Sequence, residues 1–116
     1  MARVVAFVPD LLFGSNVLGA LRAGGHDAIL VSAEDGLRSA LPGAEVLIID
    51  LTADAGPRIE LTTHALGGDG PRTLAFYSHV EADVRALAEQ AGFDLVIPRS
   101  RMAREGPALV DGLLAR

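Results

Sequence analysis

The sequence of 116 residues contains no lysine, no cysteine and no tryptophan. Without lysine, no Schiff base, phosphate-loop lysine or lysine switch can operate. Without cysteine there is no disulfide, no thiolate nucleophile and no cysteine-ligated zinc site, which is typical of a protein of the reducing cytoplasm. One tyrosine and four phenylalanines leave the core to be built mainly from valine, leucine, isoleucine and alanine. Such small aliphatic side chains suit helices layered on a sheet.

The chain is acidic, with 15 Asp and Glu against 10 Arg and a net charge of −5. That balance repels nucleic acid and anionic membrane surfaces. The first apolar run, residues 4–8, is too short for a signal peptide or a membrane span. We therefore expect one cytoplasmic domain over residues 1–116, with no nucleic acid or membrane partner.

Short runs of branched apolar residues alternate with stretches of helical spacing. The predicted strands are residues 4–8, 28–31, 46–49, 73–77 and 95–97. Because each parallel connection needs a crossover, strands interleaved with helices predict a parallel sheet covered on both faces. We predict an α/β fold, a three-layer α/β/α sandwich of flavodoxin-like type with five parallel strands in the order 2-1-3-4-5.

End signals mark where the intervening helices begin. A serine caps the first N–H groups of a helix, and proline tolerates the first turn because its missing N–H is not needed there. Glu81, three residues after Ser78, completes a capping box for a helix over residues 80–91. The predicted helix starts lie at Ser15, Ser32, Pro57, Ser78 and Pro107.

The run Val-Leu-Ile-Ile at residues 46–49 closes on Asp50. A buried parallel strand that ends in a carboxylate delivers that group to the sheet edge where such folds bind ligands. The strand order brings residues that follow other strands to the same edge. The candidate binding residues there are Asp10, Thr52, Ser78 and Arg99, and Asp10 and Asp50 are candidate ligands for Mg²⁺.

Four of these candidates also have a purely structural interpretation. Asp50 would anchor the loop after its strand, and Asp10 would form a turn or cap a helix. Ser78 is most simply a helix cap. Arg99 would be a solvated member of a cluster with Arg101 and Arg104.

Other polar residues give weaker signals. His26 lies in a helix-to-strand turn and is interpreted as structural, and neither His64 nor His79 belongs to a metal motif. The segment Gly14-Ser15-Asn16 could present backbone N–H groups to an anion. It lacks the spacing of dinucleotide and phosphate-binding loops.

Three features resemble the receiver domains of two-component response regulators over nearly the whole chain. They are the order of elements, the strand closing on Asp50-Leu51, and the segment Ala91-Gly92-Phe93-Asp94 before the last strand. The resemblance implies Asp50 as the phospho-acceptor, a Mg²⁺ site beside it, and signalling through a protein partner or a homodimer.

Three positions depart from that family's pattern. The acidic pair after the first strand is Pro9-Asp10, the hydroxyl after the fourth strand falls on Tyr77, and the lysine after the fifth falls on Arg99. Losing one carboxylate weakens Mg²⁺ binding, and a planar guanidinium is not equivalent to an ammonium group. The sequence therefore resembles the atypical, or pseudo-receiver, members.

Three functions are compatible with these residues. The first is a stand-alone receiver-like signalling module that binds a protein partner, with phosphorylation of Asp50 open but not expected. Its working surface would be the edge formed by the fourth strand and helix 80–91, or the last helix with Leu109, Val110 and Leu113.

The second function is a small-molecule or anion-binding domain that uses Gly14-Ser15-Asn16, Ser78 and Arg99. The N-terminal half also resembles the first unit of nucleotide-sugar transferases. The third is a small metal-dependent hydrolase, for which the sequence supplies no convincing nucleophile and base pair. We therefore do not expect an enzyme.

Overall fold

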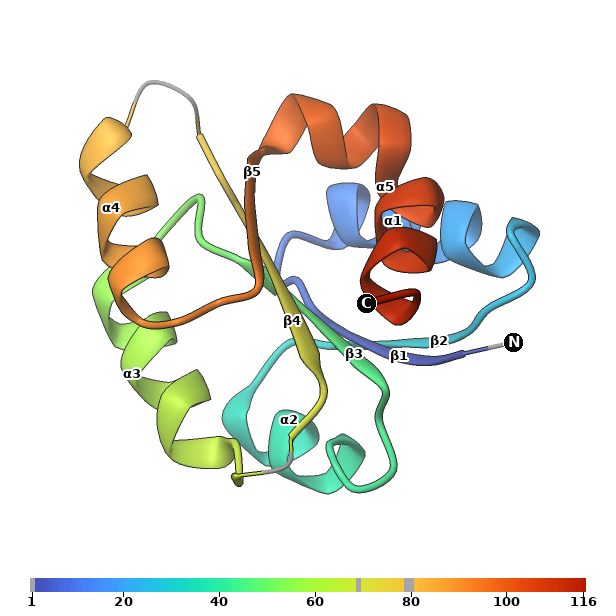
Figure 1. Cartoon of the computed structure of the whole chain (residues 1–116), viewed down its shortest axis with the longest axis horizontal. Helices are drawn as coiled ribbons and strands as arrows, with labels where there is room; N and C mark the ends of the chain where they lie inside the picture. Colours follow the sequence, from blue (N-terminus) through green and yellow to red (C-terminus); the bar gives the residue numbers. More distant parts are fainter. Residues whose placement is uncertain (1, 69, 79–80) are drawn as a thin grey trace.

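The computed structural model describes residues 2–68, 70–78 and 81–116. Strands and helices alternate along the whole chain (Figure 1). The elements are β1 (Arg3–Phe7), α1 (Leu11–Ala23), β2 (Asp27–Val31), α2 (Glu34–Ala40), β3 (Val46–Asp50), α3 (Ala55–Ala65), β4 (Arg72–Tyr77), α4 (Ala82–Gln90), β5 (Leu95–Pro98) and α5 (Arg99–Leu114).

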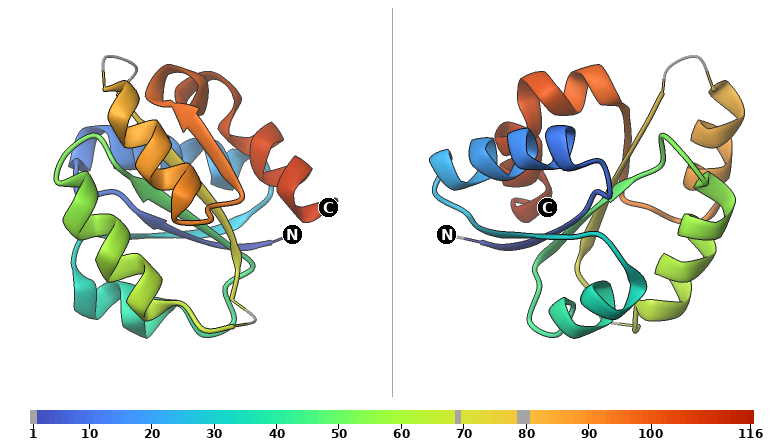
Figure 2. Two further views of the ribbon diagram at one scale, coloured as in Figure 1. Left: turned by 60° about the vertical axis from the view of Figure 1, so that its left-hand side comes forward. Right: turned by 180° about the vertical axis from the view of Figure 1, so that it is seen from behind.

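The strands form one parallel sheet in the order β2-β1-β3-β4-β5, which confirms the predicted fold class and strand order. Helices α1 and α5 cover one face of the sheet, and α2, α3 and α4 cover the other (Figures 1 and 2). The pairing is continuous in the centre, where β3 is hydrogen-bonded to both β1 and β4. In the described part of the chain, no helix is long and apolar enough to cross a membrane.

Successive residues of a strand point to opposite faces of the sheet, so each central strand contributes side chains to the apolar core on both faces. In β3, Val46 and Ile48 pack with α1 and α5, whereas Leu47 and Ile49 pack with the helices on the other face. All four side chains are fully buried. A strand that is buried on both faces has a continuous apolar sequence, which is why the sequence predicts β3 as a central strand.

The segment Ala91-Gly92-Phe93-Asp94 connects α4 to β5 as the family resemblance implied. Gly92 adopts a φ of 89°, a conformation that favours glycine. The Asp94 carboxylate accepts hydrogen bonds from the backbone N–H and the hydroxyl of Thr73 at 2.8 and 3.2 Å. In return, the Asp94 N–H donates to the Thr73 hydroxyl at 2.9 Å. This reciprocal pair fixes β5 against the start of β4.

Several predicted helix starts are wrong. The first helix begins at Leu11 and its cap is Asp10, not Ser15. Helix α2 begins after Ala33 without a side-chain cap bond, so Ser32 is not its cap.

The predicted capping box at the fourth helix is also wrong. Helix α4 begins after Glu81, which makes no side-chain cap bond, and Ser78 lies outside the helix. The backbone N–H of Glu81 instead donates to the Ser78 carbonyl oxygen at 2.9 Å. Residues 79 and 80, part of the predicted helix, lie outside the described residues.

Pro57 lies in the first turn of α3, as predicted, but Pro107 lies inside α5 rather than at its start. The last helix begins at Arg99, directly after β5. A proline inside a helix removes one backbone hydrogen bond and bends the axis. The ribbon of α5 accordingly changes direction part-way along its length (Figure 1).

Candidate functional site

Asp50 ends β3 at the carboxyl edge of the sheet and is only 2% exposed. Its Oδ1 accepts a hydrogen bond from the Thr52 backbone N–H at 2.8 Å and another from the Thr52 hydroxyl. A carboxylate that bonds to the backbone two residues ahead forms an Asx-turn. One carboxylate oxygen of Asp50 is thus used to shape the loop that leads into α3.

Arg58 of α3 supplies the remaining partner of Asp50. Its Nη1 donates to the Asp50 carbonyl oxygen at 2.9 Å and lies 3.7 Å from Oδ2 of the same residue. The two side chains are 15% and 3% exposed, so this is a largely buried ion pair. Sequence reasoning missed Arg58. A cation near Asp50 could have been expected, because a carboxylate at the end of a buried strand requires one nearby.

Asp10 and Arg99 lie together at the same edge. The Asp10 carboxylate accepts the Phe13 N–H at 3.1 Å as the cap of α1, and its Oδ2 lies 3.4 Å from Nη2 of Arg99. Arg99 also stacks over the Phe13 ring, with its Cζ 4.2 Å from the ring centroid. Asp10 therefore has a structural role, and Arg99 is held in place on two sides.

A surface hollow of about 540 Å³ lies beside this pair. The structure brings three of the predicted site residues, Thr52, Ser78 and Arg99, to its wall. Neither Asp10 nor Asp50 is among the described residues that line it. The lining is Phe13, Thr52, Ser78, Glu81, Arg99, Ser100 and Ala103.

The donor set does not fit Mg²⁺, the ion that the resemblance to receivers led us to expect beside Asp50. Mg²⁺ demands near-octahedral oxygen coordination and is usually bound through one or two carboxylates that can face it. Both candidate carboxylates, those of Asp10 and Asp50, are already engaged by N–H groups and by arginine side chains. In the described ranges, no cluster of three His, Cys, Asp or Glu is arranged to hold a metal.

The other predicted polar features have structural surroundings. His26 is buried, and its Nε2 lies 2.9 Å from the Asp111 carboxylate of α5. Gly14 lies inside α1, where its N–H donates to the Asp10 carbonyl oxygen at 2.8 Å. The segment Gly14-Ser15-Asn16 is therefore not at the helix start, and the Gly14 N–H is not free to bind an anion. Tyr77 is 6% exposed and packs in the core against α4. His79 lies outside the described residues.

No family model and no curated protein matches the sequence. Solved structures do match. The chain is similar to a response regulator receiver protein from Burkholderia phymatum, with 22% identity, a TM-score of 0.81, and coverage of 99% of this chain and 96% of that one. It is also similar to a response regulator from Thermotoga maritima, with 13% identity, a TM-score of 0.83, and coverage of 100% and 99%.

A third similar structure is that of an atypical orphan response regulator, described with a phosphorylation-independent regulatory mechanism. It is 13% identical, with a TM-score of 0.76 and coverage of 97% of this chain and 95% of that one. Across the described residues the chain therefore has the fold of response regulator receiver domains.

Proposed function

We propose that the chain is a receiver-like regulatory module that binds a protein partner in its unmodified state, with Asp50 acting as a structural residue. The observation that carries this proposal is the engagement of Asp50. A phospho-acceptor must present a carboxylate oxygen to a phosphodonor in line. Here one oxygen is bonded to Thr52, the other faces Arg58, and the residue is 2% exposed.

The surroundings of Asp50 support the same proposal. Phosphoryl transfer depends on a metal ion that neutralises the developing negative charge. The chain has Pro9 where receivers have a second acid, and Asp10 caps α1 and pairs with Arg99. The likeness to an orphan regulator described as phosphorylation-independent points the same way.

The partner surface that we propose is the outer face of α4. The sequence also suggested the last helix with Leu109, Val110 and Leu113. We favour α4 because Val110 and Leu113 are 0% and 1% exposed and Leu109 packs partly buried against the core. On α4, Leu87 is 47% exposed and lies beside the ion pair of Arg85 and Glu89. A lone apolar side chain between charges suits a small, reversible contact with a protein partner or a second copy of this chain.

Intact-mass spectrometry tests the first part of this proposal. The protein is incubated with Mg²⁺ and acetyl phosphate, with Asp50→Asn as the matched variant. We expect neither protein to gain the mass of a phosphoryl group. A gain in the wild type that is absent from Asp50→Asn would show that Asp50 is a phospho-acceptor and would overturn the proposal.

The partner surface is tested by comparing two exposed leucines. Leu87 of α4 and Leu12 of α1 are 47% and 77% exposed, so either can become aspartate without opening the core. Affinity capture measures how much partner protein each variant binds, and light scattering measures self-association. We expect binding to be lost in Leu87→Asp and retained in Leu12→Asp. Equal retention by both variants would reject α4 as the partner surface.

A further inference from the structure

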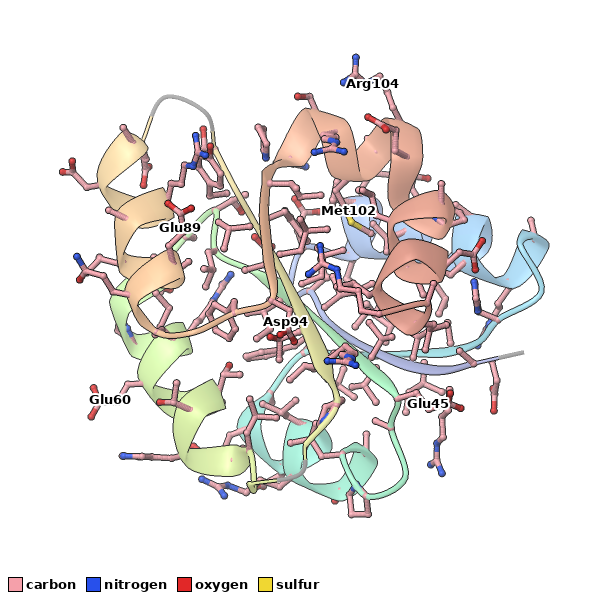
Figure 3. The ribbon with its side chains drawn as sticks, in the orientation of Figure 1. Glu45, Glu60, Glu89, Asp94, Met102 and Arg104 are labelled. Atoms are coloured by element: carbon pink, nitrogen blue, oxygen red, sulfur yellow. The ribbon has the colours of Figure 1, made fainter. Side chains whose placement is uncertain are left out.

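A narrow cleft of about 170 Å³ runs between α1 and α5, next to the hollow at Arg99. Its floor is apolar and buried, formed by Val17, Leu21, Met102 and Gly106. The Met102 side chain projects from α5 toward α1 (Figure 3). The complete lining is Phe13, Asn16, Val17, Ala20, Leu21, Met102, Ala103, Gly106 and Pro107.

The sequence of α5 explains why this space exists. Pro107 interrupts the helical hydrogen bonds and bends α5. At the bend, the Met102 side chain takes the space beside Gly106, where a Cβ would lie 2.9 Å from Met102 Cε. On the outer rim, Ala20 of α1 and Ala103 of α5 are too small to close the gap. A tightly packed pair of helices would fill this space with larger side chains.

The cleft and the hollow adjoin each other. Phe13 and Ala103 line both of them, and the Arg99 guanidinium stacks 4.2 Å above the Phe13 ring. An apolar cleft therefore adjoins a wall that carries one cation and three hydroxyl groups. The hydroxyl groups belong to Thr52, Ser78 and Ser100.

The charges at the hollow limit what can bind there. Arg99 has five N–H donors, and its polar contact among the described residues is with Asp10, through a single nitrogen at 3.4 Å. Glu81 also lines the hollow, and Asp10 lies next to it through its contact with Arg99. Two acidic side chains beside one guanidinium repel a dianion such as phosphate more strongly than a singly charged head group.

We propose that the cleft and the hollow together bind a small monoanionic amphiphile, a carboxylate attached to a compact apolar group. The carboxylate pairs with Arg99 and with the hydroxyl groups of Ser78 and Ser100, since the Thr52 hydroxyl already donates to Asp50. The apolar group enters the cleft between α1 and α5. A cavity of about 150 Å³ accommodates a benzene ring, so one ring of about six carbon atoms matches the volume. This inference goes beyond the proposed function and does not depend on whether Asp50 is phosphorylated.

The test is a titration of ¹⁵N-labelled protein with phenylacetate, followed by amide NMR shifts. We expect saturable shifts confined to α1, the start of α5 and the loop at Thr52. Acetate supplies the head group without the ring, and benzyl alcohol supplies the ring without the charge. Each should bind at least about tenfold more weakly, equivalent to about 1.4 kcal/mol.

Two variants test the charged part and the apolar part of the site separately. Arg99→Gln removes the charge, and Ala103→Leu fills the cleft from an exposed position on α5. Arg104→Gln is the control, because Arg104 is 72% exposed and projects away from the body (Figure 3). We expect the first two variants to lose at least about tenfold in affinity and the control to keep it.

Four outcomes would overturn the inference. They are the absence of saturable shifts in the wild type, equal binding of benzyl alcohol, tighter binding of inorganic phosphate than of phenylacetate, and unchanged affinity in Ala103→Leu. The amide spectrum of each variant shows directly whether it remains folded, so loss of folding is not mistaken for loss of binding.

Discussion

The Arg58 guanidinium reaches from α3 to the end of β3, where it donates to the Asp50 carbonyl oxygen at 2.9 Å and lies 3.7 Å from the Asp50 carboxylate. Both side chains are largely buried. Taking two charges out of water is costly, but leaving one of them buried without the other costs more. The pair therefore fixes the loop after β3 and keeps the Asp50 carboxylate engaged.

Removing Arg58 should destabilise the fold. Arg58→Met leaves the Asp50 charge buried without its cation, and we expect a loss of about 3 kcal/mol in the free energy of unfolding. Asp50→Asn removes the charge but keeps an oxygen for the Thr52 N–H, so its loss should be smaller. Urea denaturation of both single variants and the double variant measures the coupling. Strictly additive losses would contradict a direct interaction.

Two glycines of α1 should respond oppositely to the same substitution. A Cβ at Gly14 would lie 3.0 Å from Leu30 Cδ1 and 3.2 Å from the Val8 carbonyl oxygen, whereas a Cβ at Gly19 meets nothing within 4 Å. Gly19→Ala should stabilise the protein by up to about 1 kcal/mol through helix propensity. Gly14→Ala should destabilise it by about 1 kcal/mol through overpacking. Thermal unfolding of the two variants checks the signs, and matching shifts would refute the close packing of Gly14.

Asp94 should matter for stability rather than for binding. It lies at the start of β5 (Figure 3), where its carboxylate accepts two hydrogen bonds from Thr73. Asp94→Ala leaves a partly buried N–H without an acceptor, and we expect a loss of about 1–3 kcal/mol in unfolding free energy. Asp94→Asn keeps one acceptor oxygen and should lose less. Chemical denaturation measures both, and an unchanged midpoint for the alanine variant would count against the reciprocal pair.

The sheet could be predicted from sequence because its signals are local and repeated. Each central strand is a short run of branched apolar residues, and parallel pairing forces a crossover between consecutive strands. The convergence of Thr52, Ser78 and Arg99 follows from that topology, since all three come after the carboxyl ends of neighbouring strands. The type of each element and the order of the strands can therefore be predicted from apolar patterns within a single sequence.

The helix ends and the partners of Asp50 could not be predicted in the same way. Ser15 has a capping side chain but lies inside α1, because Asp10 is closer to the strand end and takes the cap first. Pro107 looks like a helix start, yet packing of α5 on the sheet outweighs the cost of an internal proline. The contact of Arg58 with Asp50 depends on how α3 sits on the sheet, which no spacing in the sequence reveals.

Adding the second acidic residue that receivers carry and removing the engaged arginine should make Asp50 reactive. Pro9→Asp completes the acidic pair with Asp10 and so adds a carboxylate for Mg²⁺, and Arg58→Ala frees the Asp50 oxygen that faces α3. We expect the double variant to bind Mg²⁺ by calorimetry and to gain a phosphoryl mass from acetyl phosphate. Pro9→Asp alone should bind the ion weakly and gain no phosphoryl mass, because Arg58 still engages the acceptor. Full phosphorylation of that single variant would show that the second carboxylate alone suffices for reactivity, and that the buried ion pair with Arg58 does not restrain Asp50.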